Sequence, residues 1–161
     1  MKKISIITLI AVLAVGSSVF AAEYTKFSSN FVKHFKDCDK YEETTTSEFE
    51  GQNFVTKRQI YGWKNGFCKY QENIKSPDTE YQLDCSFTNL QVDELYNSMK
   101  SRSKEIERYE LENFVQQTDQ KTGQKKYVSV GTTIIKGNKA FITWSKYQNN
   151  PYFCVPKKIT P

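Results

Sequence analysis

The segment from Tyr61 to Phe87 constrains the fold most, because it combines a strong turn signal with two of the four cysteines. Asn65 and Gly66 both tolerate positive φ angles, which a two-residue type I′ turn requires. This turn pairs Trp63 with Cys68 and, two residues further out, Tyr61 with Tyr70. Because side chains alternate between the two faces of a strand, we expect these four side chains to share the core face of a sheet.

A second turn, Ser76-Pro77-Asp78-Thr79, suits a type I turn with proline at its second position. A strict four-residue loop at this turn would place Cys68 opposite Phe87. A longer loop, or a bulge, would place Cys68 opposite Cys85 with a Cα separation of about 5.5 Å, which a disulfide can span. We expect the register that aligns the two cysteines.

The four cysteines predict two disulfides, because an even number in an exported chain favours oxidised pairs. We expect Cys68–Cys85 and, by elimination, Cys38–Cys154, while the other two connectivities remain open. Successive cysteines are separated by 30, 17 and 69 residues, which lacks the paired spacing of zinc knuckles. His34, the one histidine, cannot complete a mixed zinc site. We therefore expect no metal and no cofactor.

The first 22 residues have the pattern of a secretory signal peptide. Lys2 and Lys3 precede an apolar run from Ile4 to Val15, and small residues lead to a cleavage site near Ala21 or Ala22. An anchor helix is the alternative, but the run is short and no stop-transfer flank follows. We expect a periplasmic or secreted protein with one domain over residues 23–161 and no transmembrane segment after cleavage.

The charge pattern argues against a nucleic-acid partner. The chain has 23 Lys and Arg against 18 Asp and Glu, a formal net charge of +5. Removing the two lysines of the signal peptide leaves +3. The basic residues are interspersed with acidic ones, whereas nucleic-acid binding favours a dense basic block.

Two helices are predicted from periodicity and capping signals. The segment Thr25–Asp37 is amphipathic, and its apolar stripe contains Phe27, Phe31, His34 and Phe35, with Lys33 and Lys36 outside the stripe. Thr88 and Gln91 form a capping box at the start of a second helix. The apolar face of that helix contains Val92, Leu95, Tyr96 and Met99.

The predicted fold class is α+β: an N-terminal helix, an antiparallel meander of about four strands, a second helix and a C-terminal meander of about three strands, stapled by disulfides. Tyr109–Gln117 fits either a helix or a strand. We prefer a strand, because a hairpin-type turn and a β-rich segment follow. Ala140–Ser145 reads as the last strand of the C-terminal meander. Residues 156–161 are expected to form a mobile tail.

Motifs for the common catalytic chemistries are missing. The chain has no G-x-S-x-G elbow, no P-loop and no G-x-G-x-x-G motif. His34 has no local nucleophile motif, so we interpret it as the edge of the apolar stripe. A pair of carboxylates could hydrolyse a glycosidic bond. The candidates by residue type alone are Glu42, Glu43, Glu48, Glu50, Glu110 and Glu112. Solvated strand faces explain these residues without any chemistry.

Candidate binding residues are Trp144, Tyr147 and Tyr152, which cluster near the Asn149-Asn150-Pro151 loop. Aromatic and amide side chains on loops suit recognition of glycans or peptides. Core packing of Trp144, with the tyrosines over a disulfide, explains the same residues and is the interpretation we favour.

The leading functional hypothesis is a non-enzymatic binding or inhibitor module of the cell envelope or extracellular space. Its partner would be an envelope or extracellular protein, or a glycan. One alternative is a carboxylate-dependent hydrolase that acts on cell-wall or other glycan material. A second alternative is a structural component of the envelope.

Overall fold

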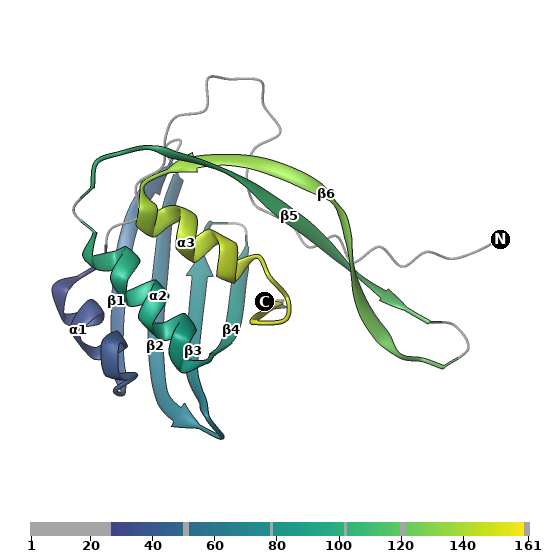
Figure 1. The fold of residues 1–161 in the computed structure, drawn as a ribbon, viewed down its shortest axis with the longest axis horizontal. Coiled ribbons are helices and arrows are strands. Elements are labelled where there is room, and N and C mark those ends of the chain that lie inside the picture. The colour runs from purple at the N-terminus through teal and green to yellow at the C-terminus, as the bar shows by residue number, and fades with distance from the viewer. Residues whose placement is uncertain (1–26, 50–51, 78, 102, 120–121, 160–161) are drawn as a thin grey trace.

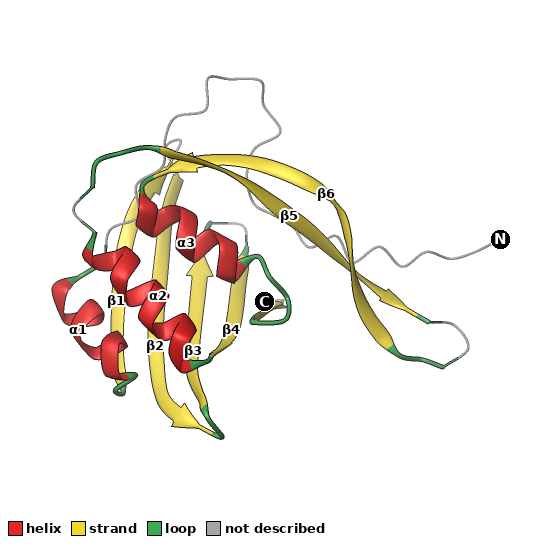
Figure 2. Cartoon of the chain, in the orientation of Figure 1, coloured by secondary structure: helices red, strands yellow, loops and turns green. Residues whose placement is uncertain are grey.

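The computed structural model describes residues 27–49, 52–77, 79–101, 103–119 and 122–159. The expected signal peptide, residues 1–22, lies outside these residues. The described chain forms a five-stranded antiparallel sheet with a layer of helices on one face, and a two-stranded ribbon projects from this body (Figures 1 and 2). The elements are α1 (Ser29–Asp37), β1 (Tyr41–Phe49), β2 (Gln52–Lys64), β3 (Phe67–Lys75), β4 (Glu80–Phe87), α2 (Asn89–Lys100), β5 (Glu107–Thr118), β6 (Lys125–Gly137), α3 (Lys139–Gln148) and β7 (Cys154–Ile159).

The sheet has the strand order β1-β2-β3-β4-β7, and β5 and β6 pair only with each other in the described chain. The predicted α+β class, with a helix first and disulfide staples, is confirmed. The capping box of α2 is also present, since Gln91 Oε1 accepts a hydrogen bond from the Thr88 N–H at 2.8 Å. Among the described residues, no helix is both long and apolar enough to cross a membrane.

The core lies between the sheet and the three helices and is dominated by aromatic rings. Trp144 of α3 is buried at its centre. Its ring centroid lies 5.3 Å from that of Phe35 in α1 and 5.4 Å from that of Tyr70 in β3. Aromatic rings bury large areas, so one tryptophan can join a helix to several strands.

The first turn forms as predicted, but a bulge changes the register behind it. Trp63 pairs with Cys68, and Asn65 and Gly66 have φ angles of 52° and 78°. The register then shifts between Ile60 and Gly62, so that Ile60 lies opposite Tyr70. The prediction that Tyr61 pairs with Tyr70 on the core face is therefore wrong. The Tyr61 hydroxyl instead donates to Gln59 on the open face of the sheet, at 2.9 Å.

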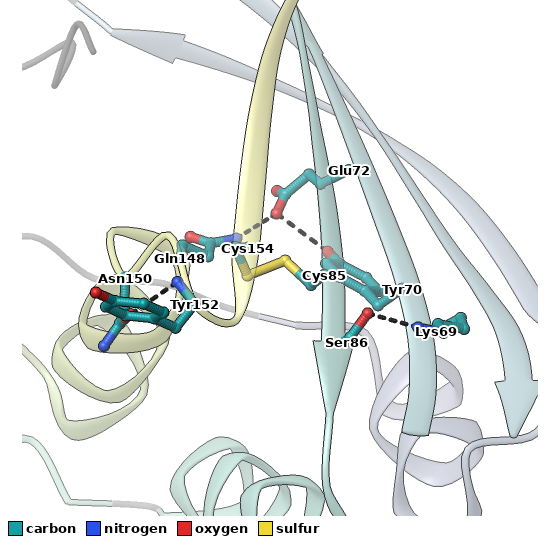
Figure 3. Close-up of a disulfide and its surroundings, with 9 residues drawn as sticks. All are labelled: Lys69, Tyr70, Glu72, Cys85, Ser86, Gln148, Asn150, Tyr152 and Cys154. Atoms are coloured by element: carbon teal, nitrogen blue, oxygen red, sulfur yellow. Dashed lines mark hydrogen bonds between the residues drawn. A yellow bond between two sulfur atoms is a disulfide. The ribbon is translucent and has the colours of Figure 1, made fainter. Parts of the chain in front are cut away.

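The disulfides join Cys38 to Cys68 and Cys85 to Cys154, so the predicted connectivity is wrong. The second turn is the strict four-residue loop, because Lys75 pairs with Glu80. This register places Cys68 opposite Phe87, and it places Cys85 opposite Tyr70. Cys68 then bonds to Cys38, the C-cap residue that directly follows α1, while Cys85 bonds to Cys154 across the β4–β7 pair. Figure 3 shows this second bridge.

Residues Ala140–Ser145, predicted as a strand, belong to helix α3. Asn138 is the N-cap, and its side chain accepts a hydrogen bond from the Phe141 N–H at 2.8 Å. Buried positions 140, 143, 144 and 147 follow helical spacing and form one face of the helix, while the buried Ile142 packs against the ribbon. Burial of this face outweighs the β-propensity of the segment.

The remaining C-terminal elements are strands. Tyr109–Gln117 lies within β5, as preferred. Leu111 of β5 and Ile135 of β6 form a small apolar cluster with Ile142, which anchors the base of the ribbon to α3. The expected mobile tail is wrong for residues 156–159, because they continue β7 and pair with β4. Residues 160–161 lie outside the described chain.

Candidate functional site

A groove of about 590 Å³ lies between α1 and α2, on the outer surface of the helical layer. It is open to solvent and combines apolar and charged side chains from both helices and from the residue that precedes α1. Its lining residues are Phe27, Ser29, Val32, Lys33, Lys36, Asp37, Tyr96, Met99 and Lys100. Cavities of 300–1,000 Å³ with apolar walls and a few polar groups are typical of ligand sites.

Helix α1 serves the core with one face and the groove with another. Phe31 and Phe35 are fully buried against the sheet. The groove residues occupy positions 29, 32, 33, 36 and 37. These positions recur at i, i+3, i+4, i+7 and i+8, so they form one stripe along the helix. The residue pattern of α1 therefore places its core-facing and groove-lining side chains on two different faces of the helix.

Helix α2 contributes its C-terminal half to the groove. Val92 and Leu95 are fully buried and hold the helix on the core. Tyr96 and Lys100, four residues apart, lie on the neighbouring face, and the Lys100 ammonium group lies 5.1 Å from the Tyr96 ring centroid. An ammonium group over an aromatic face is attracted by the ring quadrupole, which keeps this lysine at the wall of the groove.

The charge of the groove is positive. Lys33, Lys36 and Lys100 are all exposed and face one carboxylate, Asp37. Within the described chain, none of these three lysines takes part in an ion pair. Their ammonium groups therefore remain available to a negatively charged ligand.

The groove floor is supported from below by a buried charge network, in which Arg58 of β2 is central. The Arg58 guanidinium lies 4.9 Å from the centroid of the Phe27 ring. It forms ion pairs with Glu43 of β1 at 3.3 Å and with Glu72 of β3 at 3.4 Å. Ser28, the N-cap of α1, donates a hydrogen bond to the other oxygen of Glu43.

The Glu72 carboxylate is also fully engaged. One oxygen accepts hydrogen bonds from the Tyr70 hydroxyl, at 3.1 Å, and from the Gln148 amide (Figure 3). Burial raises the pKa of Tyr70 well above its usual range, and the Glu72 charge adds to this effect. Burial alone would lower the pKa of Arg58, but Glu72, Tyr70 and Glu43 outweigh it and leave the pKa raised. Three of the four carboxylate oxygens of the network accept hydrogen bonds, and the fourth, Glu72 Oε1, is held by the ion pair with Arg58, which suits a structural role better than acid–base chemistry.

The structure separates the residues that the sequence offered as binding candidates. Trp144 and Tyr147 are buried, and the Tyr147 hydroxyl donates to Glu94. Burial raises the pKa of Tyr147, and the hydrogen bond to Glu94 raises it further. Tyr152 is 68% exposed and packs edge-on against Phe114 and Tyr127 of the ribbon. These three candidates therefore do not form one site.

The carboxylates offered for hydrolysis are also dispersed. Glu42 pairs with Lys57, and Glu43 belongs to the buried network. Glu110 and Glu112 are exposed on the ribbon. The side chain of Glu48 and all of Glu50 lie outside the described residues. His34 stacks on Tyr41, with ring centroids 4.6 Å apart, at the edge of the core.

Two of the groove lysines, Lys33 and Lys36, were visible in the sequence as residues outside the apolar stripe of the first helix. Their role could not be predicted, because it depends on where α2 packs. Comparison of the chain with protein-family models, with curated proteins and with solved structures finds no match. The chemistry of the groove itself therefore provides the basis for a functional proposal.

Proposed function

We propose that this chain is an exported, non-enzymatic binding module and that the groove between α1 and α2 is its binding site. The ligand would combine an apolar body with negative charge. The observation that carries the proposal is the arrangement, around an apolar floor, of three lysines that form no ion pair with any described residue. Apolar walls supply affinity by burial, and charge complementarity supplies specificity.

Export is supported by the signal-like N-terminal sequence and by the two disulfides, which are typical of oxidising compartments. A non-enzymatic role is supported by the carboxylates. Among the described residues that line the groove, Asp37 is the one acid, whereas a glycosidase requires two that converge on one bond.

Binding can be tested with anilinonaphthalene sulfonate (ANS), a probe that carries an apolar ring system and one negative charge. Its fluorescence rises when it enters an apolar site. We expect the mature protein to bind ANS saturably. A triple variant, Lys33→Glu, Lys36→Glu and Lys100→Glu, should bind it about ten-fold more weakly or worse.

The matched control reverses three exposed lysines away from the groove, namely Lys104, Lys125 and Lys126. Both variants have the same net charge, so a difference between them reports the location of the site. Cooperative thermal unfolding checks that each variant is folded. Equal ANS affinity in the two variants would contradict the proposal, and so would a native protein that shows no saturable binding.

A further inference from the structure

One end of the body exposes three large apolar side chains. Trp63 is 42% exposed, Phe67 is 41% exposed and Leu90 is 80% exposed. Trp63 and Phe67 flank the Asn65-Gly66 turn between β2 and β3, which lies at the end of the body remote from the projecting ribbon (Figure 1). We call these three residues, together with Lys64 and Lys69, the aromatic tip.

The strand register places Trp63 beside Cys68 on the helix-covered face of the hairpin and Phe67 beside Lys64 on the opposite face, so the aromatic tip exposes apolar side chains on both sides of the turn. Cys68 lies between Trp63 on one side and Phe87 on the other. Helix α2 begins two residues after Phe87, so Leu90 in its first turn lies at the same end of the sheet. Three exposed apolar side chains at one end of a small domain indicate an interaction surface.

The aromatic tip is held rigidly. The Trp63 indole N–H donates to the Asp37 backbone oxygen at 3.0 Å. The adjacent Cys38–Cys68 bridge ties the same hairpin to the end of α1. The exposed side chains are therefore presented by a fixed turn, which lowers the entropic cost of binding.

Both charged residues of the aromatic tip, Lys64 and Lys69, are basic, and the exposed Asp37, whose backbone oxygen accepts from Trp63, lies at its border. No Asp or Glu occurs from Gln59 to Gln71 or from Ser86 to Val92. The ammonium groups of Lys64 and Lys69 lie 5.6 Å from the Tyr61 ring centroid and 5.3 Å from the Phe67 ring centroid. Each lysine thus presents its charge beside an aromatic ring.

We propose that the aromatic tip docks this protein on the surface of an anionic lipid bilayer. Tryptophan and other amphipathic rings prefer the headgroup region, where exposed leucine and phenylalanine can reach the acyl boundary. Lysines beside them are attracted to anionic headgroups. The docking surface borders the groove between α1 and α2 at Asp37, but its own residues do not line that groove, and the inference does not depend on the function proposed for it.

The test is co-sedimentation of the mature protein with phosphatidylglycerol-containing vesicles and with pure phosphatidylcholine vesicles. We expect binding to the anionic vesicles that weakens as salt is added, and weaker binding to the neutral ones. Trp144 is buried, so quenching of tryptophan fluorescence by brominated lipid would report insertion of Trp63.

A double variant, Phe67→Ser and Leu90→Ser, removes apolar surface without touching the core, and its affinity for anionic vesicles should fall about ten-fold. The control, Val130→Ser and Val155→Ser, removes exposed apolar side chains elsewhere and should bind like the native protein. Three results would overturn the proposal: no binding by the native protein, equal loss in both variants, or sedimentation without vesicles, which would indicate self-association.

Discussion

Replacing Arg58 with methionine should destabilise the protein severely. The substitution keeps much of the apolar stem but leaves the carboxylates of Glu43 and Glu72 without their cation. These side chains are only 9% and 7% exposed. Breaking a buried ion pair by removing one partner costs about 3–5 kcal/mol, because a charge stays buried without compensation. Loss of the guanidinium contact with the Phe27 ring contributes about 1 kcal/mol of that total.

A loss of this size is a large part of the about 5–15 kcal/mol by which most domains are stable. It corresponds to a melting temperature roughly 10–20 °C lower for a domain of this length. Urea unfolding followed by far-ultraviolet circular dichroism measures the free energy of unfolding directly. Arg108→Met is the matched control, because Arg108 is exposed on β5, and it should change stability by less than about 0.5 kcal/mol.

The decisive comparison is a triple variant that also carries Glu43→Gln and Glu72→Gln. All three charges are then removed together, and the Ser28, Tyr70 and Gln148 donors still have amide oxygens to meet. We expect this variant to recover most of the loss and to unfold within about 2 kcal/mol of the native protein. A cost below about 1 kcal/mol for Arg58→Met, or a triple variant as unstable as the single one, would refute the reasoning.

Three further predictions concern the disulfides and two titrating groups. Loop entropy predicts that removing the Cys38–Cys68 bridge, which closes 30 residues, costs about 3.5 kcal/mol of stability, and that removing the Cys85–Cys154 bridge, which closes 69, costs about 4.5 kcal/mol. Urea unfolding of the two cysteine-to-serine variants measures both losses, and a larger loss for the Cys38–Cys68 bridge would contradict the prediction. Burial opposes ionisation of Asp84, but hydrogen bonds from Lys157 and two glutamines outweigh it and lower its pKa below the ordinary 3.8. The ionised carboxylate therefore adds stability above pH 3.8 that is lost as the pH falls through the folded pKa. Asp84→Asn should cost less than about 1 kcal/mol at neutral pH and converge with the native protein in acid; a constant difference in urea unfolding across pH would count against this. Tyr147 has a raised pKa, so its neutral form adds stability below its ordinary pKa of 10.0, and this stability is lost as the pH rises through the folded pKa. In an absorbance titration, the Tyr147→Phe variant should lack one late-titrating tyrosine, and the loss of an early-titrating one would contradict the prediction.

Local signals in the sequence predicted local structure well. Asn65-Gly66 defined the first hairpin turn, because few residues adopt positive φ at low cost. Thr88 and Gln91 located the start of α2 for a similar reason, since side-chain caps satisfy backbone donors that have no partner in the helix. Features of this kind depend on neighbouring residues alone.

The errors came from long-range choices. The bulge at Gly62 has no unique sequence signal, yet it moves Tyr61 to the other face of the sheet. The predicted Cys68–Cys85 pairing required a longer loop between β3 and β4, but the strict four-residue turn from Ser76 to Thr79 forms and sets the register instead. The α3 segment has β-branched and aromatic residues, but it becomes a helix because its buried positions match the space above β3 and β4.

The candidate site was predictable only in fragments. Counting alternate residues from Cys68 places Tyr70 and then Glu72 on the inner face, so a buried carboxylate could have been foreseen. Its partner Arg58 required the β2–β3 register. The groove required the packing of α1 against α2, which no local pattern encodes.

Helix α1 explains why the buried network and the groove occur together. A nine-residue helix is too short to be stable alone in water. Its first turn is tied to the network through Ser28 and Phe27, and its last residue is followed by Cys38, which is bonded to β3. Both ends are thus fixed to the sheet, and the lysine-bearing face between them has one orientation. A groove wall fixed in this way loses little conformational entropy when a ligand binds. This gain in affinity offsets the cost of burying the three charges of the network.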